Sequence, residues 1–246
     1  MLKTTNLYLG SMDNFLRELV NNKDKKKYFG MNTDCYLIAL RDKTYKTILQ
    51  SKNAVVYIDG MGIIFGQKIL KDSVAEERIA TTDMFPKLFE FIDEHKIKGK
   101  KIYLLGGKKE TVNRVYENFS RQYKYPIIAG YNDGYSFDLD HSEEIIEDIN
   151  SLGIDYLFVG LGCPLQEKWI ERNFEKLNVK NILSCGGLFD YYAGNVKRAP
   201  FWMQKCGLEW LYRFFQEPKR LFKRYFLGNT KYALLICKYR WRRKSL

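Results

Sequence analysis

The stretch that decides the fold is Ala54-Val55-Val56-Tyr57-Ile58, which is followed directly by Asp59-Gly60-Met61-Gly62. A continuous apolar run rich in β-branched residues is typical of a strand that is buried on both faces of a sheet. The glycines that follow permit a tight turn and leave space around the acid. We therefore predict a central strand at residues 54–58 that ends at an accessible carboxylate, Asp59.

The same pattern recurs along the chain. Residues 101–105 precede Gly106-Gly107, and residues 155–159 precede Gly160-Leu161-Gly162. Shorter strands are expected at residues 6–9, 126–129 and 181–185, and helices at residues 13–21, 34–50, 110–123 and 166–177, with Asp13 as an N-cap. Apolar strands that alternate with amphipathic helices predict an α/β fold: a Rossmann-like, mostly parallel sheet with helices on both faces.

In such a fold ligands bind where the strands end, so the turns after the strands are the candidate sites. Glycine turns let backbone N–H groups approach a phosphate, and a following helix N-terminus adds partial positive charge. Each turn on its own is equally compatible with simple chain reversal. Several glycine-bearing strand ends together favour an anionic ligand.

Three acidic or polar side chains near these turns have two interpretations each. Asp59 is placed to act as a base, or it caps the next element through an Asx turn. Gln166 and Glu167 follow Pro164 at a helix start and can face a ligand, or they are ordinary residues of a first helical turn.

Asp138-Leu139-Asp140 resembles the metal-binding DxD motif of many nucleotide-sugar transferases. Asp140 and Glu143, however, have the spacing of a capping box before an apolar helical face, and we favour that interpretation. With two histidines far apart and no other acidic cluster, the sequence predicts no tightly bound metal.

The positive charge of the chain lies at its C-terminal end. Residues 197–246 contain 14 Lys or Arg against 2 Glu, so they carry all of the net charge of +12. Aromatic residues are interleaved with these cations, which is typical of peripheral attachment to an anionic membrane surface. Nucleic-acid binding predicts a similar composition, and a helix docked on the core explains the first half of the segment equally well. We divide the chain into a core, residues 1–196, and a C-terminal appendage, residues 197–246.

The compartment is expected to be the cytoplasm. The five cysteines follow no metal or disulfide pattern, which fits free thiols in a reducing environment. The N-terminus lacks the apolar run of a signal peptide, and no segment approaches the length of about 20 apolar residues that a membrane span needs.

Several blocks of the chain, in order, resemble one known family. They are Asp59-Gly60-Met61-Gly62, Glu77-Arg78, Leu105-Gly106-Gly107, Gly134-Tyr135, residues 159–169, Ala193-Gly194 with Arg198-Ala199-Pro200 and Trp202, residues 207–213, and Glu217-Pro218 with Arg220. On these blocks the chain is similar to the WecG/TagA/CpsF glycosyltransferases.

The resemblance implies an inverting, metal-independent enzyme with no cofactor. Such an enzyme would move N-acetylmannosamine or its uronic acid from a UDP-sugar to a polyprenyl-diphosphate-linked N-acetylglucosamine. It would serve synthesis of wall teichoic acid, capsule or a related surface glycan, on the inner face of the cell membrane.

The resemblance also implies roles for individual residues. Asp59 would be the general base and Asn32 a second catalytic residue, whereas Gly30 stands where the family usually has threonine. Substrate contacts would come from Gly106, Gly107, Gly134, Tyr135, Gly160, Gly162, Gln166, Glu167, Arg198, Arg213, Arg220 and Arg224. Arginine suits the departing diphosphate because its planar fork binds phosphate oxygens in pairs.

Two other classes of function stay open. A UDP-sugar-modifying enzyme would need a bound nicotinamide and a Tyr-x-x-x-Lys base, which the sequence does not place convincingly. A nucleic-acid-binding α/β protein would use the basic segment, although the resemblance implies no nucleic-acid partner. A homo-oligomer that covers an apolar groove of the appendage also stays open.

Overall fold

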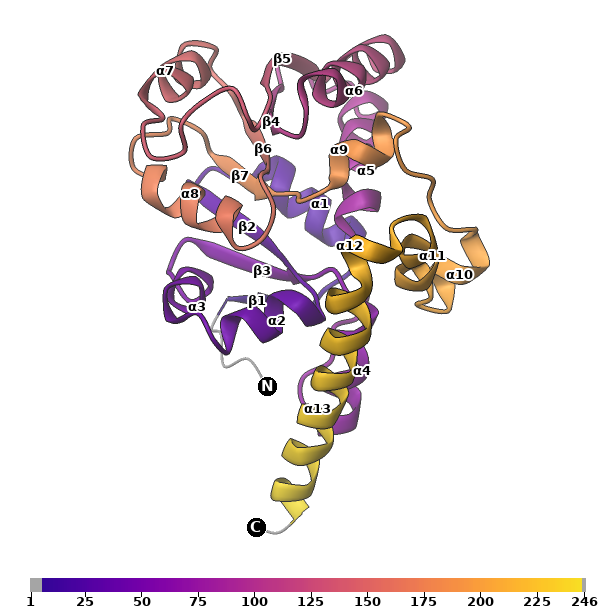
Figure 1. Ribbon diagram of the computed structural model, residues 1–246. Helices are drawn as coiled ribbons and strands as arrows, with labels where there is room; N and C mark the ends of the chain where they lie inside the picture. Colours follow the sequence, from indigo (N-terminus) through magenta and orange to yellow (C-terminus); the bar gives the residue numbers. More distant parts are fainter. Residues whose placement is uncertain (1–5, 245–246) are drawn as a thin grey trace.

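The computed structural model describes residues 6–244, and they form one parallel sheet of seven strands covered by helices (Figure 1). The strands are β1 (Leu7–Tyr8), β2 (Lys26–Met31), β3 (Ala54–Ile58), β4 (Lys101–Gly106), β5 (Ile127–Asn132), β6 (Tyr156–Gly160) and β7 (Asn181–Ser184). Their order is β1-β3-β2-β7-β6-β4-β5, and every neighbouring pair is parallel. The predicted α/β fold class is confirmed.

Helices cover both faces of the sheet. One face carries α1 (Met12–Asn21), α5 (Thr81–Glu94), α6 (Lys109–Gln122) and α9 (Leu188–Tyr192). The other carries α2 (Thr33–Ala39), α3 (Lys43–Leu49), α4 (Met61–Leu70), α7 (Glu143–Ser151) and α8 (Leu165–Asn173). Central strands are buried on both faces, as the run at residues 54–58 predicts: Val56 and Tyr57 point to opposite sides and are both fully buried.

Three local predictions are wrong. The segment 34–50 forms two helices instead of one. Asp42 is the N-cap of the second helix, where its carboxylate accepts a hydrogen bond from Tyr45 N (2.9 Å), so the first helix ends before it. The first helix is capped by Ser11, whose hydroxyl accepts from Asn14 N, and not by Asp13. The helix expected at residues 166–177 is shorter and ends at Asn173.

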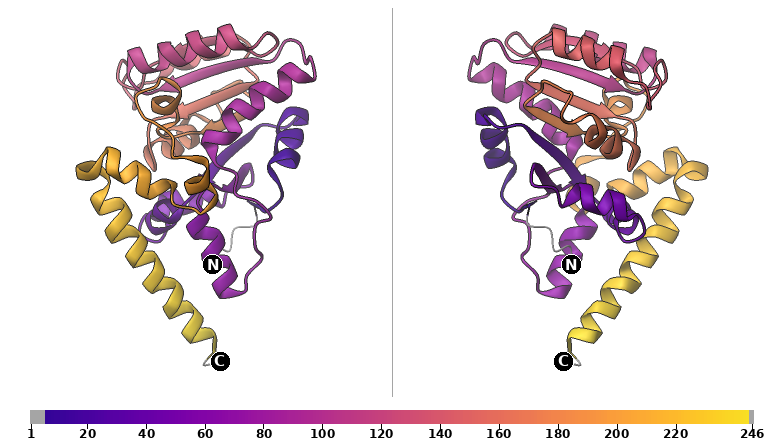
Figure 2. Two further views of the ribbon diagram at one scale, coloured as in Figure 1. Left: turned by 90° about the vertical axis from the view of Figure 1, so that its right-hand side faces the viewer. Right: turned by 90° about the vertical axis from the view of Figure 1, so that its left-hand side faces the viewer.

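After residue 196 the chain continues through short helices into one long helix. These are α10 (Phe201–Lys205), α11 (Glu209–Gln216), α12 (Pro218–Phe222), a π-helical turn η1 (Lys223–Leu227) and α13 (Gly228–Lys244). The long helix α13 packs on α2 and α4 and runs down to the tip of the molecule, drawn in yellow in Figure 2. None of the helices within residues 6–244 combines the length and apolarity that crossing a bilayer requires.

Candidate active site

A cavity of about 670 Å³ lies at the carboxyl ends of β2, β3, β6 and β7. Loops after these strands form its floor, and α11, α12, η1 and α13 form its outer wall. This is the edge of a parallel sheet where the fold predicts ligand binding. The C-terminal segment therefore contributes directly to the cavity.

Asp59 lines this cavity at the end of β3. Its carboxylate accepts a hydrogen bond from the backbone N–H of Thr81 (3.0 Å), which fixes the orientation of the side chain. Burial raises the pKa of Asp59 above its ordinary value, whereas the charge of Arg78 and the Thr81 bond oppose that shift. A carboxylate with a raised pKa is a stronger base, so this geometry suits proton abstraction.

Asn32 lies beside Asp59, after β2, and lines the same cavity. Its side-chain oxygen accepts from the N–H groups of Asp34 and Cys35, both at 3.0 Å, and so caps α2. Because the side-chain oxygen is used in these bonds, the amide NH₂ of Asn32 is the group that can donate to a ligand. At Gly30 a Cβ would lie 3.2 Å from Thr81 Oγ1 and 3.3 Å from Asp59 Cβ, so glycine allows Thr81 and Asp59 to approach β2 closely.

Three arginines of the appendage line the opposite wall of the cavity. Arg213 and Arg220 both bind the carboxylate of Glu217, and Arg224 pairs with Asp34 at 3.1 Å. The three arginines outnumber Glu217 and Asp34, the two carboxylates with which they pair, and a guanidinium fork can bind phosphate oxygens in pairs.

Arg213 is the most constrained of the three. Its side chain is buried, its guanidinium lies 4.9 Å from the centre of the Tyr191 ring, and Nη2 lies 2.7 Å from Glu217. Its Nη1 atom is buried with no hydrogen-bond partner within residues 6–244. A buried guanidinium with an unused donor is costly unless a ligand accepts from it, which supports anion binding here.

Arg198 does not line the cavity. It pairs with Asp83 of the core (2.6 Å) and with Glu209 of α11 (3.5 Å), and Arg78 pairs with the same Glu209 at 3.1 Å. These alternating charges join the appendage to the core. Arg198 therefore links the appendage to α5 of the core. Its predicted contact with substrate stays a prediction.

Gln166 and Glu167 are buried at the start of α8. The amide oxygen of Gln166 accepts from Gly162 N (3.1 Å) and Gly186 N (3.0 Å), so it joins the loops after β6 and β7. Glu167 lies behind Gln166, outside the cavity lining, and accepts from its amide nitrogen at 2.8 Å. Gln166 and Gly162 line the cavity, while Glu167 supports them.

The remaining predicted substrate contacts lie at or just after the ends of β4, β5 and β6: Gly106, Gly107, Gly134, Tyr135 and Gly160. Gly106 has a positive φ of 128° and its backbone meets that of Gly160 so closely that no side chain fits. Gly134 N donates to Gly107 O at 2.9 Å, and Tyr135 is largely exposed. None of these five residues lines the cavity, and their substrate contacts stay predictions.

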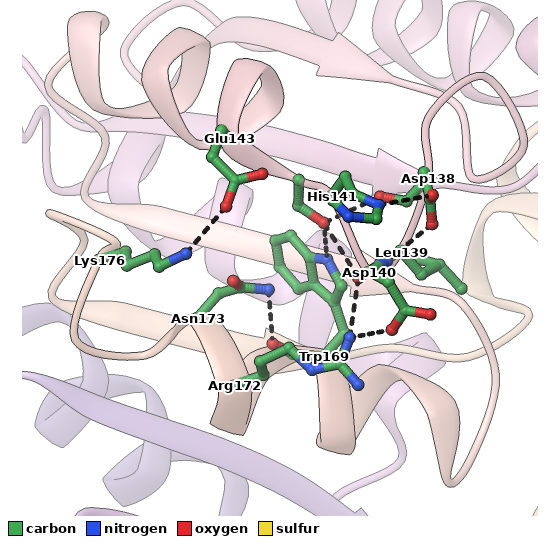
Figure 3. A network of polar contacts seen from close by, with 10 residues as sticks. Asp138, Leu139, Asp140, His141, Glu143, Trp169, Arg172, Asn173 and Lys176 are labelled. Atoms are coloured by element: carbon green, nitrogen blue, oxygen red, sulfur yellow. Dashed lines mark hydrogen bonds and ion pairs between the residues drawn. The ribbon is translucent and has the colours of Figure 1, made fainter.

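The Asp138–Asp140 loop is engaged in protein contacts, as Figure 3 shows. Asp138 binds the imidazole of His141 at 2.9 Å, and Asp140 pairs with Arg172. The predicted capping box is wrong: the N-cap of α7 is Ser142, and Glu143 pairs with Lys176 at 3.0 Å. In the described chain, 6–244, no three His, Cys, Asp or Glu side chains are grouped to hold a metal ion.

Sequence reasoning assigned no role to Arg78, Thr81, Tyr191, Glu209 or Glu217. Arg78, Glu209 and Glu217 stand in blocks of the family resemblance, so that resemblance was the available signal. The contacts of Thr81 and Tyr191 depend on tertiary packing that no local pattern reports.

The fold and the cavity together define an α/β protein with a candidate ligand site at the carboxyl ends of its strands. The model of the glycosyl transferase WecG/TagA/CpsF family matches residues 2–246, and the chain belongs to this family. It is therefore a glycosyltransferase, as the resemblance implied.

Curated relatives cover most of the chain. The chain is 36% identical over 209 residues to the N-acetylglucosaminyldiphosphoundecaprenol N-acetyl-beta-D-mannosaminyltransferase of Bacillus subtilis, covering 85% of this chain and 77% of that protein. Proteins of the same name from Bacillus spizizenii and Staphylococcus aureus (strain MW2) are 31% and 30% identical. They match over 82% and 72% of this chain, and 74% and 68% of their own length.

Proposed function

We propose that the enzyme transfers N-acetylmannosamine from a UDP-sugar to N-acetylglucosamine carried on a polyprenyl diphosphate. The names of the three relatives specify this acceptor and this sugar. The observation that carries the proposal is a single cavity lined by Asp59 on one side and by Arg213, Arg220 and Arg224 on the other. Such an arrangement pairs a base with an anion-binding wall, which a displacement at a sugar-diphosphate bond requires.

In the proposed mechanism Asp59 removes the proton from the attacking acceptor hydroxyl. Its orientation by Thr81 N and its raised pKa both favour this step. The hydroxyl oxygen attacks the anomeric carbon and the bond to the diphosphate breaks on the opposite face, so the configuration inverts. The arginines stabilise the departing UDP diphosphate, and no metal is required. Asn32 would donate from its amide nitrogen to a sugar oxygen.

The appendage would also attach the enzyme to the inner face of the membrane. Large exposed apolar side chains occur along it: Phe201, Trp202, Phe215, Phe222, Phe226, Leu227, Leu234 and Trp241. Aromatic rings interleaved with Lys and Arg favour the interface of an anionic bilayer. A peripheral enzyme of this kind would meet its lipid-linked acceptor during synthesis of wall teichoic acid, capsule or a related glycan.

A transfer assay tests the proposal. Purified enzyme, UDP-N-acetylmannosamine and a polyprenyl-diphosphate-linked N-acetylglucosamine should yield a disaccharide lipid, with or without a metal chelator. A protein lacking residues 197–246 should keep a folded core, by circular dichroism, and lose transfer. Failure of the intact enzyme to extend this acceptor would overturn the proposed function, and full activity of the shortened core would overturn the role of the appendage.

A further inference from the structure

The cavity that holds Asp59 continues into an apolar arm between α4 and α13. We define this arm by Phe65, Gly66 and Ile69 of α4, and by Ala233, Ile236 and Cys237 of α13. Because one cavity contains both the arm and Asp59, the arm leads directly to the reacting centre.

The helix α4 is mostly apolar, and only Gln67 and Lys68 are polar among its ten residues. Ile63, Ile64 and Leu70 are buried against the core, yet Phe65 and Ile69 are 48% and 49% exposed. Residues four apart lie on one face of a helix, so Phe65 and Ile69 form a continuous apolar stripe. A surface helix normally exposes polar residues, so a stripe of two large apolar side chains left exposed beside a cavity suits an apolar ligand.

The arm is held in shape by close packing of the two helices, which descend together from the body of the molecule (Figure 1). A Cβ at Gly66 would overlap Tyr232 Oη and lie 3.2 Å from Ile236 Cδ1, so the helices approach as closely as glycine permits. At the far end Arg243 pairs with Asp72 at 2.9 Å and donates to Leu70 O. The apolar walls of the arm are therefore fixed by contacts at both ends.

We infer that the apolar arm binds the first isoprenoid units of the lipid that carries the acceptor sugar. This inference rests on the proposed function, which supplies a polyprenyl diphosphate as acceptor. The diphosphate would lie near the arginine wall, and the hydrocarbon chain attached to it would leave along Phe65 and Ile69. From Phe65 to Ile69 the helix rises about 6 Å, roughly the length of one isoprenoid unit. Met61, which also lines the cavity, extends this length to about 12 Å, or two to three units.

The arm would also direct the hydrocarbon chain of the acceptor toward the membrane surface. Its far end lies beside Arg243, which donates to Leu70 O. The same end of α13 carries Arg240 and Arg242, which would meet anionic headgroups. The rest of a long polyprenyl chain could then remain in the bilayer. The stripe and Asp59 line the same cavity, as expected if one lipid-linked acceptor binds to both. Binding of the stripe to a bilayer or to a second copy of the chain would not require a shared cavity.

Two exposed free thiols allow a direct test. Cys237 lines the arm, whereas Cys206 is exposed elsewhere on the appendage and does not line the cavity. A diphosphate with a chain of three isoprenoid units, added to the intact protein without detergent, should slow maleimide labelling of Cys237. At ten times its Kd the slowing should be about tenfold, with Cys206 as the internal control. Labelling at each thiol would be followed by mass spectrometry.

Four results would overturn the inference. The first is unchanged labelling of Cys237, and the second is equal protection by inorganic diphosphate. The third is protection by vesicles but not by the short prenyl diphosphate, which would assign the stripe to the bilayer. The fourth is protection that rises with protein concentration in the absence of ligand, which would assign it to a second copy of the chain.

A variant pair separates this inference from the proposed function. Phe65→Ala with Ile69→Ala removes exposed apolar contacts and should raise the KM for a short prenyl-linked acceptor by about tenfold. The KM for an acceptor whose diphosphate carries only a methyl group should not change. Ile127→Ala removes a similarly exposed side chain (46%) from the edge strand β5 and serves as the matched control. Transfer to the methyl acceptor with no effect of chain length would overturn the inference alone, whereas absence of all transfer would overturn the proposed function.

Discussion

Gly66→Ala should detach α13 from the core, because no space exists for the added methyl group. The new Cβ would overlap Tyr232 Oη, lie 3.1 Å from Tyr232 Cζ and 3.2 Å from Ile236 Cδ1. Both side chains are buried, with exposed fractions of 5% and 2%, so neither can move aside without shifting the helix. Overpacking of this kind typically costs about 1–3 kcal/mol, which is roughly a 5- to 150-fold shift toward the undocked helix.

Hydrogen exchange of residues 228–244 would report docking, and transfer to the lipid-linked acceptor would report function. We expect faster exchange in this segment and slower transfer, with unchanged exchange in the core strands. Tyr232→Phe removes the overlapping oxygen, so the double variant should recover part of both losses. Unchanged exchange and transfer in Gly66→Ala would refute the proposal that docking of α13 completes the site.

Three further outcomes follow from the charges in and behind the cavity. Because burial raises the pKa of Asp59, the acid limb of the kcat/KM profile should lie above the ordinary aspartate value of about 3.9. Arg78→Met should move this limb to still higher pH, because the charge of Arg78 lowers the pKa of Asp59, and Arg78→Lys should move it less. An acid limb that stays in place or moves to lower pH in Arg78→Met would contradict this assignment. Burial also raises the pKa of Glu167, so its ionisation disfavours the folded state as pH rises above the unfolded-state value. Glu167→Gln should therefore gain stability relative to the native protein as the pH rises above about 4.5 in denaturant melts, and a stability difference that does not change with pH would argue against a buried carboxyl. Arg213→Lys should weaken UDP binding in calorimetry by roughly 10- to 150-fold, the range for one charge-assisted hydrogen bond of about 1.5–3 kcal/mol, and an unchanged affinity would remove Arg213 from the anion site.

Local patterns were sufficient to predict the strand at residues 54–58 and the carboxylate that follows it. The apolar run and the glycines after Asp59 are neighbours in sequence, so their geometry follows from short-range rules. The position of β7 between β2 and β6 could not be predicted, because it depends on pairing between residues about 150 positions apart, such as Lys27 and Ile182.

The appendage arginines were predictable as a group but not individually. Arg213 enters the cavity while Arg198 is held by Asp83 and Glu209, and only tertiary packing brings those two carboxylates together. Glu167 was expected to face a ligand from the first turn of a helix. The structure buries it behind Gln166, because the rotation of α8 about its axis is set by packing of Trp169 and Ile170 on the sheet.

The apolar stripe on α4 is visible in the amino-acid sequence of the helix. The sequence Met61-Gly62-Ile63-Ile64-Phe65-Gly66 continues to Leu70 with only Gln67 and Lys68 as polar residues, so it lacks the polar face of an ordinary surface helix. Helical periodicity alone therefore indicated an additional apolar contact for this element.

The most direct measurement is single-turnover transfer by Asp59→Asn, together with titration of the variant with UDP. Asparagine has nearly the same shape and can still accept the hydrogen bond from Thr81 N, but it cannot take a proton. We expect transfer to slow by roughly 10²- to 10⁴-fold, the usual effect of removing a general base, while the affinity for UDP stays unchanged. Transfer at a near-native rate would show that another group removes the proton and would contradict the account of this site.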